Sequence, residues 1–511
     1  MQHWDDGYYT QSTYTHGYFR ELAPVFQRFC LLLHGFVADA PAAPQQHCEL
    51  GFGQGVSAAI HAAATPGHYW GTDFNPAHAA HANALCQGFA EEAHLFDNSF
   101  AELLTRGDLP PFDSISLHGV WSWINRENQA IIVEFVRKFL KPGGVLYISY
   151  NCWPGHAHLA PLRALLHLSD TYSHRHGSTK DRVTNALDFA QKLLEARPNY
   201  ARAVPEALKR LEYMRKQGND YLAHEYLNAD WMCMYFAEVA EQMQAGAKCA
   251  YACSASPLDG IEIIHLREDG RAFLAGIADP LLREQARDYF VNRQFRKDVF
   301  MRGARQLPPT EALRRLLDTP LALMNYGEVP LTLTGTLGTY TLHAEKYTRM
   351  LDWFREHRVG GTLAACLAHM PDISPAAARE MCAILVGKGV LHPCQSPEAQ
   401  EAVLGKCARL NATLCQRAAY SNDINYLASP VIGGGLHVNR LEQLFLKLGM
   451  ADPAALAEAV WGMLHAQGQR LVHDGRTLES EADNREELQR MAGDFLEKRL
   501  PLLRALHVTC A

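Results

Sequence analysis

The sequence predicts an α/β fold built on a largely parallel sheet. Strand-like and helix-like segments alternate through the first 150 residues. A glycine-rich turn at residues 51–55 follows the first strand signal, and Asp73 closes the next one. Such alternation requires parallel strands joined by right-handed crossovers. A glycine turn that opens a helix, with an acid at the end of the following strand, is typical of a nucleotide-type cofactor site.

Five strands and three helices are expected in this first region. We predict strands at residues 48–52, 69–73, 93–96, 113–118 and 145–150, and helices at 56–64, 76–89 and 128–140. In a parallel sheet, ligand-binding residues gather at the carboxyl ends of the strands. Those ends hold the glycine turn, Asp73, Asp97 and His118.

The spacing of the glycines narrows the kind of cofactor. A dinucleotide turn would need a glycine where Val56 stands, and the pattern present is Glu49-x-Gly51-x-Gly53-x-Gly55. Glycines leave no Cβ atoms in the turn, so a ligand can contact the backbone. The pattern resembles motif I of the class I S-adenosylmethionine-dependent methyltransferases, in which the leading acid lies near the methionine amino end of the cofactor.

The ends of the second and third strands supply further cofactor candidates. Asp73 can accept hydrogen bonds from two ribose hydroxyls, and Phe74 follows it directly. In the fold that motif I implies, an acid or amide after the third strand binds the adenine amino group, so Asp97, Asn98 and Ser99 are candidates. A helix N-cap formed by Asp97 or Ser99 is equally compatible with the local sequence.

The fourth strand ends in His118-Gly119-Val120-Trp121-Ser122-Trp123. Enzymes that methylate amide or base nitrogens commonly carry Asn or Asp, Pro, Pro and an aromatic residue here, so acceptors of that kind lose support. Trp121 and Trp123 are candidates to wall a cationic acceptor through cation–π contact, and packing under the following loop is the alternative. His118 is the candidate to orient the acceptor or relay its proton, and a supporting position behind the site is the alternative.

Several further segments extend the resemblance. The chain is similar to bacterial class I methyltransferases that carry a methyltransferase regulatory domain, among them rickettsial lysine methyltransferases that modify outer-membrane proteins. The segments that carry this similarity are residues 14–19, 49–55, 71–76, 117–124, 149–155, 221–228 and 295–300. The resemblance implies a Rossmann-like seven-stranded sheet and S-adenosylmethionine as cofactor. On this basis Tyr14 and Tyr18 are expected to cover the cofactor, and Asn151 and Trp153 to line the acceptor channel.

The domain organisation follows from the strand count. Two more strands must follow the fifth, yet residues 159–244 read as nearly all helix, and strand signals resume only at 247–254, 261–266 and 295–301. We therefore predict a methyltransferase domain at 1–169 plus 233–305, with a helical insertion at 170–232. In similar proteins this insertion mediates dimerisation, which implies a homodimer.

The carboxy-terminal half shows helices and one hairpin signal. Helices are expected at 311–318, 346–356 and 376–388, with a hairpin at 331–342. We predict a winged-helix-like middle domain at 306–395 and a helical carboxy-terminal domain at 396–511.

Bulk composition fits a large globular enzyme and excludes some roles. The 511 residues are 20% charged and 48% hydrophobic, with a net charge of -7, which disfavours nucleic-acid binding. No signal peptide or membrane span is evident, so we expect a cytoplasmic protein. The 13 cysteines form no C-x-x-C pair and are expected to be reduced and unpaired. The 25 histidines show no metal-site spacing, so no metal is expected.

The leading functional hypothesis is an S-adenosylmethionine-dependent N-methyltransferase that acts on protein lysine by direct in-line transfer. The resemblance supplies the lysine. A lysine amine must lose its proton first, and an apolar, aromatic entrance lowers its pKa by desolvation. Two alternatives stay open: a small-molecule methyltransferase, and a regulatory or scaffold protein that binds the cofactor without turnover.

Overall fold

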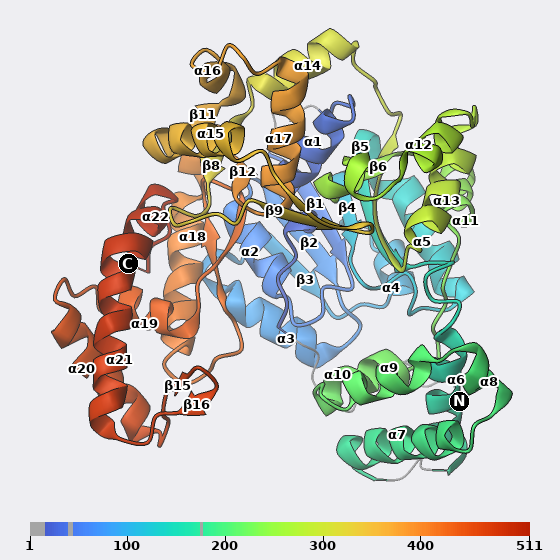
Figure 1. Cartoon of the computed structure of the whole chain (residues 1–511), viewed down its shortest axis with the longest axis horizontal. Helices are drawn as coiled ribbons and strands as arrows, with labels where there is room; N and C mark the ends of the chain where they lie inside the picture. Colours follow the sequence, from blue (N-terminus) through green and yellow to red (C-terminus); the bar gives the residue numbers. More distant parts are fainter. Residues whose placement is uncertain (1–15, 39–43, 174–176, 511) are drawn as a thin grey trace.

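A computed structural model shows the arrangement of the chain and describes residues 16–38, 44–173 and 177–510. Its centre is a seven-stranded sheet in the order β3-β2-β1-β4-β5-β7-β6 (Figure 1). The strands are β1 (Gln46–Leu50), β2 (His68–Thr72), β3 (Ala93–Phe96), β4 (Phe112–Leu117), β5 (Leu140–Asn151), β6 (Cys249–Ser254) and β7 (Phe295–Arg302). Strands β1 to β5 pair in parallel, and β7 runs antiparallel between β5 and β6. The predicted fold class is confirmed.

Helices cover this sheet and fix the turns at its carboxyl edge. They are α1 (Pro24–Leu33), α2 (Val56–Ala64), α3 (Pro76–Leu85), α4 (Phe100–Thr105), α5 (Arg126–Phe139), α11 (Phe236–Gln242), α12 (Glu268–Ala275) and α13 (Pro280–Val291). Asn75, Ser99 and Asn125 cap the amino ends of α3, α4 and α5 with their side chains, as short polar residues commonly do. The strand and helix predictions for the first 150 residues agree with these elements.

One strand prediction is wrong. Residues 261–266 form the end of a short helical turn, η5 (Glu262–Ile264), after η4 (Pro257–Gly260). Ile261 and Ile264 are buried, whereas Ile263 is 58% exposed. Ile261 and Ile264 thus face the core one 3-10 turn apart, whereas residues three apart in a strand would point to opposite faces.

The segment between β5 and β6 is helical, as predicted. The helices α6 (Ala160–Ser173), α7 (Thr179–Glu195), α8 (Asn199–Ala203), α9 (Glu206–Met214) and α10 (Asn219–Tyr226) form a lobe at the lower right of Figure 1. Their buried residues make a separate apolar cluster between Leu162 and Leu227. The predicted start of the insertion at residue 170 falls inside α6.

The middle segment contains the predicted hairpin and helices. They are β9 (Thr332–Gly335), β10 (Gly338–Thr341), α14 (Pro309–Leu317), α15 (Ala344–His357), α16 (Leu363–Leu367) and α17 (Pro375–Gly387). A small sheet of β8 (Pro320–Leu323), β11 (Val359–Thr362) and β12 (Leu391–Pro393) accompanies them. The winged-helix description stays a prediction.

The carboxy-terminal segment lies on the opposite side of the sheet from the insertion (Figure 1). Its elements are α18 (Pro397–Arg417), β13 (Tyr426–Ser429), β14 (Gly434–His437), α19 (Arg440–Leu448), α20 (Pro453–Ala466), β15 (Val472–His473), β16 (Arg476–Thr477), α21 (Glu481–Asp494) and α22 (Leu500–Ala505). Cys415 and Cys510, 95 positions apart, form a disulfide. The expectation of unpaired cysteines is wrong for this pair, because the fold brings two distant segments together, while the other cysteines of the described chain are free thiols.

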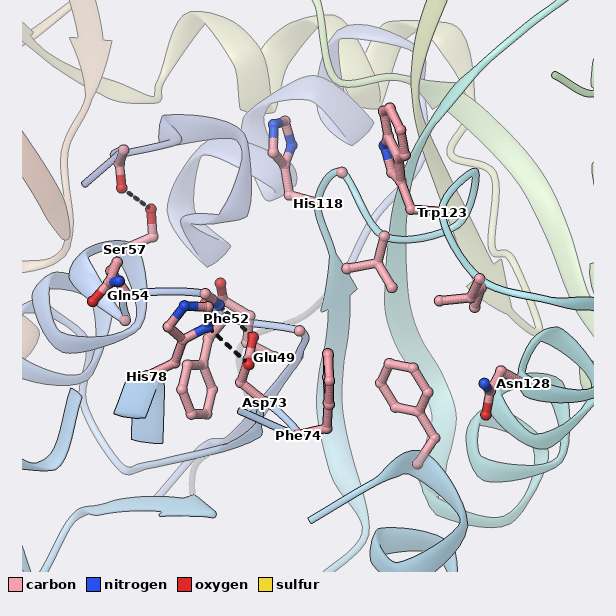
Figure 2. Close-up of a pocket in the computed structure, with 18 of the residues that line it drawn as sticks. Glu49, Phe52, Gln54, Ser57, Asp73, Phe74, His78, His118, Trp123 and Asn128 are labelled. Carbon is pink, nitrogen blue, oxygen red and sulfur yellow. Dashed lines mark hydrogen bonds and ion pairs between the residues drawn. The ribbon is translucent and has the colours of Figure 1, made fainter. Parts of the chain in front are cut away.

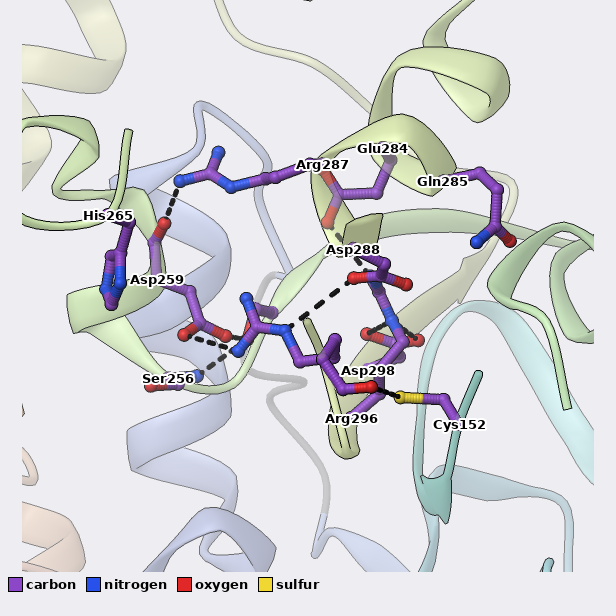
Figure 3. Close-up of polar contacts among 12 residues, drawn as sticks. Cys152, Ser256, Asp259, His265, Glu284, Gln285, Arg287, Asp288, Arg296 and Asp298 are labelled. Atoms are coloured by element: carbon purple, nitrogen blue, oxygen red, sulfur yellow. Dashed lines mark hydrogen bonds and ion pairs between the residues drawn. The ribbon is translucent and has the colours of Figure 1, made fainter. Parts of the chain in front are cut away.

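A buried charge network ties β7 to its neighbours (Figure 3). The guanidinium of Arg296 donates to Asp298 at 2.9 Å, to Asp288 at 2.7 Å and to Glu284 at 2.9 Å. Tyr150 of β5 donates to Asp298 at 2.6 Å. Because Glu284 and Asp288 belong to α13, one buried cation joins β5, β7 and α13.

Within the described residues, no helix has the length and apolar character needed to cross a membrane. The same residues contain no group of three or more histidine, cysteine or acidic side chains that could hold a metal ion.

Candidate active site

A cavity opens at the carboxyl edge of the sheet, above β1, β2 and β4 (Figure 2). It combines the glycine turn with the ends of the neighbouring strands. Its lining includes Gly17, Phe19, Glu49, Gly51, Phe52, Gly53, Gln54, Gly55, Ser57, Asp73, Phe74, His78, Asn98, Ser99, Phe100, His118, Val120, Trp123, Asn128 and Asp230. Sequence-distant candidates therefore meet where the parallel strands end, as expected for this sheet type.

The glycine turn requires glycine at two positions for steric reasons. Gly51 and Gly55 have φ of +74° and +73°, a region that side chains rarely adopt. A Cβ at Gly51 would lie 2.5 Å from Val120 Cγ2, and one at Gly55 would lie 2.3 Å from Ala82 Cβ. The bare turn lets α2 begin close to α3 and leaves backbone exposed to the cavity.

Asp73 is held in place by three donors. Its Oδ2 accepts the Gly53 N–H at 2.8 Å, and its Oδ1 accepts the Asn75 N–H at 3.1 Å. Nδ1 of His78 lies 3.0 Å from Oδ1. A carboxylate offers about four lone-pair positions, so the oriented group retains capacity for a ligand hydroxyl.

Glu49 lies in the same end of the cavity and is only 3% exposed. Burial raises the pKa of its carboxyl to about 7, and the charge of Asp73 acts in the same direction. The hydroxyl of Tyr69 donates to Oε2 at 2.7 Å, which favours the ionised form. A cation bound here would favour ionisation further.

The three candidates for adenine binding after β3 differ in whether they line the cavity. Asn98 and Ser99 line the cavity, but Asp97 is exposed and lies outside the lining. The Ser99 hydroxyl accepts the Glu102 N–H at 3.2 Å and forms a capping box at the start of α4. The expected cap is therefore confirmed for Ser99, and the structure does not bring Asp97 to the cavity.

His118 is half-buried at the other edge of the cavity. Its Nδ1 lies 2.8 Å from the Tyr147 hydroxyl and 3.3 Å from the Ser149 hydroxyl. Phe19 stacks on its ring with a centroid distance of 3.9 Å. Burial lowers the pKa of His118 to about 4, so the imidazole is neutral at neutral pH and Nε2 has no polar partner among the described residues.

Of the two tryptophans in this turn, only Trp123 lines the cavity. Trp121 is fully buried in the same apolar cluster as Ile132 of α5, and its carbonyl accepts the side-chain amide of Gln129 at 2.9 Å. The sequence-based role of Trp121 in acceptor contact is not supported by this position. The alternative of packing, which the sequence left open, describes Trp121.

The remaining sequence candidates lie away from this cavity or outside the described residues. Asn151 and Trp153 are half-buried at the end of β5 and do not line it. Tyr18 turns to β14, where its hydroxyl accepts the Gly435 N–H at 2.7 Å. Tyr14 lies outside the residues that the structure describes.

Comparisons with known proteins place the chain in a family. A model described as a methyltransferase domain matches residues 48–146, and one described as a predicted methyltransferase regulatory domain matches residues 218–302. The chain is 33% identical over 514 residues to the uncharacterized protein sll1526 of Synechocystis, an alignment that covers 99% of this chain and 100% of the relative. The chain belongs to the class I S-adenosylmethionine-dependent methyltransferases that carry a methyltransferase regulatory domain.

Two rickettsial proteins extend the comparison. The methyltransferase is 27% identical over 264 residues to the uncharacterized protein RP789 of Rickettsia prowazekii, over 48% of this chain and 44% of that one. The structure of PKMT2 from Rickettsia typhi in complex with AdoHcy superposes with a TM-score of 0.69 at 17% identity, covering 98% of this chain and 100% of the other. This likeness extends the shared fold through the middle and carboxy-terminal segments.

The regulatory-domain match has a defined place in the fold. Residues 218–302 contain α10 to α13 together with β6 and β7. In this methyltransferase the match therefore supplies two strands of the central sheet, with the charge network around Arg296. It overlaps the helical insertion only at α10.

The cavity fits S-adenosylmethionine, the cofactor of this family. An oriented carboxylate, Asp73, suits the ribose hydroxyls, and the bare glycine turn accepts close contact with backbone. Glu49 would face the amino end of the bound cofactor, and Asn98 and Phe74 line the cavity where they would meet the adenine. No residue of the set conflicts with that ligand.

Sequence reasoning missed several lining residues. Val120 and Phe52 lie inside segments that were already predicted to form the site, between His118 and Trp123 and within the glycine turn. His78 could have been found from its position five residues after Asp73 at the start of a helix. Asp230 comes from the segment after α10 and is the one described lining residue beyond position 128, so local sequence carries no signal for it.

Proposed function

We propose that this methyltransferase transfers a methyl group to the side-chain amine of lysine in a protein. The observation that carries the proposal is that Asp230 and Trp123 both line the cavity. The Met232 N–H donates to the Ser122 carbonyl at 2.8 Å, which brings the segment of Asp230 beside the turn that holds Trp123. An anionic carboxylate and an indole face both favour an incoming ammonium group. Neither is needed for a neutral amide or a base.

The reaction requires alignment more than acid–base catalysis. The bound cofactor supplies an electrophilic methyl group, and the acceptor nitrogen must present a free electron pair in line with it. A lysine amine has an ordinary pKa of about 10.4, and entry into an apolar site lowers that value by desolvation. His118 cannot retain the amine proton at neutral pH, because its own pKa is lowered to about 4. Its role is to orient the amine through Nε2.

The comparisons support a protein acceptor. The sequence resembles rickettsial lysine methyltransferases, and the fold follows that of PKMT2 along the whole chain. The cavity is also open to solvent, so a lysine side chain can enter from a protein surface.

The acceptor class can be tested with labelled S-adenosylmethionine and a lysate of the host. We expect label in protein bands, with methyl-lysine identified by mass spectrometry after hydrolysis. A matched lysate whose lysines have been acetylated should accept no label. The Asp73→Asn variant serves as the control for turnover by a contaminating enzyme.

Other outcomes would replace the proposal. Protein label that persists after lysine acetylation would exclude lysine. Label confined to small molecules would indicate a small-molecule methyltransferase. No label, despite calorimetric binding of the cofactor, would indicate a regulatory or scaffold protein.

A further inference from the structure

The segment from His16 to Phe19 lies between the cofactor cavity and the carboxy-terminal domain. Its residues alternate between the two neighbours. Gly17 and Phe19 line the cavity, while His16 and Tyr18 contact residues of the carboxy-terminal domain. Alternation of this kind is the geometry of extended backbone, in which successive side chains point to opposite sides.

Contacts on the carboxy-terminal side centre on Tyr18. Its hydroxyl accepts the backbone N–H of Gly435 in β14 at 2.7 Å, and its ring packs on Tyr426 of β13 with a centroid distance of 4.9 Å. His16 Nε2 lies 3.7 Å from Asp423, which precedes β13. The hairpin β13–β14 therefore forms a seat for the Tyr18 ring.

This seat depends on glycines in β14. A Cβ at Gly434 would lie 2.5 Å from the Tyr18 hydroxyl oxygen, and one at Gly435 would lie 2.9 Å from the ring. Both distances are shorter than ordinary Cβ contacts. Neither glycine has a positive φ, so the backbone conformation does not demand glycine and the closeness of Tyr18 supplies the reason.

On the cavity side, Phe19 and Gly17 contact His118 and the start of α2. Phe19 stacks on His118 at 3.9 Å, and its backbone N–H donates to the Ser57 hydroxyl at 2.9 Å. The same hydroxyl donates to the Gly17 carbonyl at 3.4 Å. Ser57 lies in the first turn of α2, directly after the glycine turn. A shift of Tyr18 would therefore move the two residues that cover this wall of the cavity.

We infer that the β13–β14 hairpin positions the amino-terminal wall of the cofactor cavity through Tyr18. Tyr18 is a positioning residue, because it contacts Gly435 and acts on the cavity through Gly17 and Phe19. The carboxy-terminal domain thereby sets how tightly S-adenosylmethionine is held, although Asp230 is the one described lining residue beyond position 128.

Calorimetric binding of AdoHcy to the full-length protein tests this inference. The Tyr18→Phe variant keeps the ring but loses the hydrogen bond from Gly435 and the 3.3 Å contact of the hydroxyl with Nε2 of His61 in α2, and it should bind about threefold to tenfold more weakly. The Gly435→Ala variant displaces the ring from outside the cavity and should also weaken binding. Tyr200→Phe is the matched control, since Tyr200 lies in α8 of the helical insertion, outside the cavity lining, and its hydroxyl donates to the His158 carbonyl. The affinity of this variant for AdoHcy should be unchanged.

A double-mutant comparison separates positioning from general loss of structure. In a Tyr18→Ala background the methyl group added at Gly435 meets no ring, so Gly435→Ala should cause no further loss of affinity. Circular dichroism and melting temperature establish that each variant is folded. Affinity within twofold of wild type in both folded single variants would overturn the inference, as would additive effects in the double variant. The assay needs no methyl acceptor, so its failure would leave the lysine proposal intact.

Discussion

Removal of the Asp73 carboxylate tests the cofactor site directly. Asp73 is 8% exposed and accepts hydrogen bonds from the Gly53 and Asn75 N–H groups at 2.8 and 3.1 Å. In Asp73→Asn one oxygen becomes an NH₂ group, which must face one of these donors. A hydrogen bond between a ligand hydroxyl and a charged group contributes about 1.5–3 kcal/mol. We therefore expect S-adenosylmethionine to bind at least tenfold more weakly, since each 1.4 kcal/mol is about a factor of ten.

Asp97, which follows the neighbouring strand β3, provides a control variant with the same change of charge as Asp73→Asn. Asp97 ends β3 as Asp73 ends β2, but it is exposed and outside the cavity lining. Asp97→Asn should leave calorimetric affinity unchanged within about twofold, since an exposed charge beyond the site is well screened. Equal affinity in wild type and folded Asp73→Asn would refute the assignment of Asp73 to the ribose.

Three further outcomes are expected. Because the pKa of Glu49 is raised to about 7, the affinity for the cationic cofactor should fall as pH drops from 8 to 6. A Glu49→Gln variant should lose this pH dependence in calorimetry. The unliganded wild type should lose stability as pH rises through 7, since a raised carboxyl pKa favours folding only while the group is protonated. Arg296→Met leaves buried carboxylates without their cation, so it should destabilise the fold by about 3–5 kcal/mol. The loss of melting temperature should shrink as pH falls, because burial already raises the pKa of Asp288 to about 6 beside Arg296, and removal of the cation raises it further. Tyr172 and Phe189 are 82% and 42% exposed on α6 and α7; if the insertion forms the predicted dimer, their replacement by Glu should shift sedimentation to the monomer, and a wild-type monomer would contradict it.

The cofactor side of the site could be predicted from sequence because its determinants are local. The glycines at 51, 53 and 55 occupy one turn, and Asp73 ends the next strand along the chain. Parallel strands bring such ends to one edge whatever lies elsewhere. The Glu49 carboxyl follows for the same reason, since it lies at the end of β1.

The two tryptophans after β4 show where local reasoning fails. Both tryptophans follow the predicted end of the fourth strand, where cation–π contact with the acceptor and packing under the next loop were open to each of them. The strand ends at Leu117, and the Trp123 N–H bonds the Val120 carbonyl in a turn. That turn buries Trp121 in the core while Trp123 faces the cavity. Tyr18 fails for another reason: its partner Gly435 lies 417 positions away, beyond any local pattern.

The sequence of α2 does carry a long-range signal. A helix on the surface of a sheet normally keeps a polar face, yet every residue from Val56 to Ala64 is buried. The outer face is covered by α18, whose Lys406 ammonium donates to the Ala62 and Thr65 carbonyls at 2.9 and 3.1 Å. The helix that begins at the cofactor turn is therefore enclosed between the sheet and the carboxy-terminal domain, and one apolar cluster runs through both. Because the segment from α18 onward caps the end of α2 and also contacts Tyr18, the cofactor site and this carboxy-terminal segment form one structural unit.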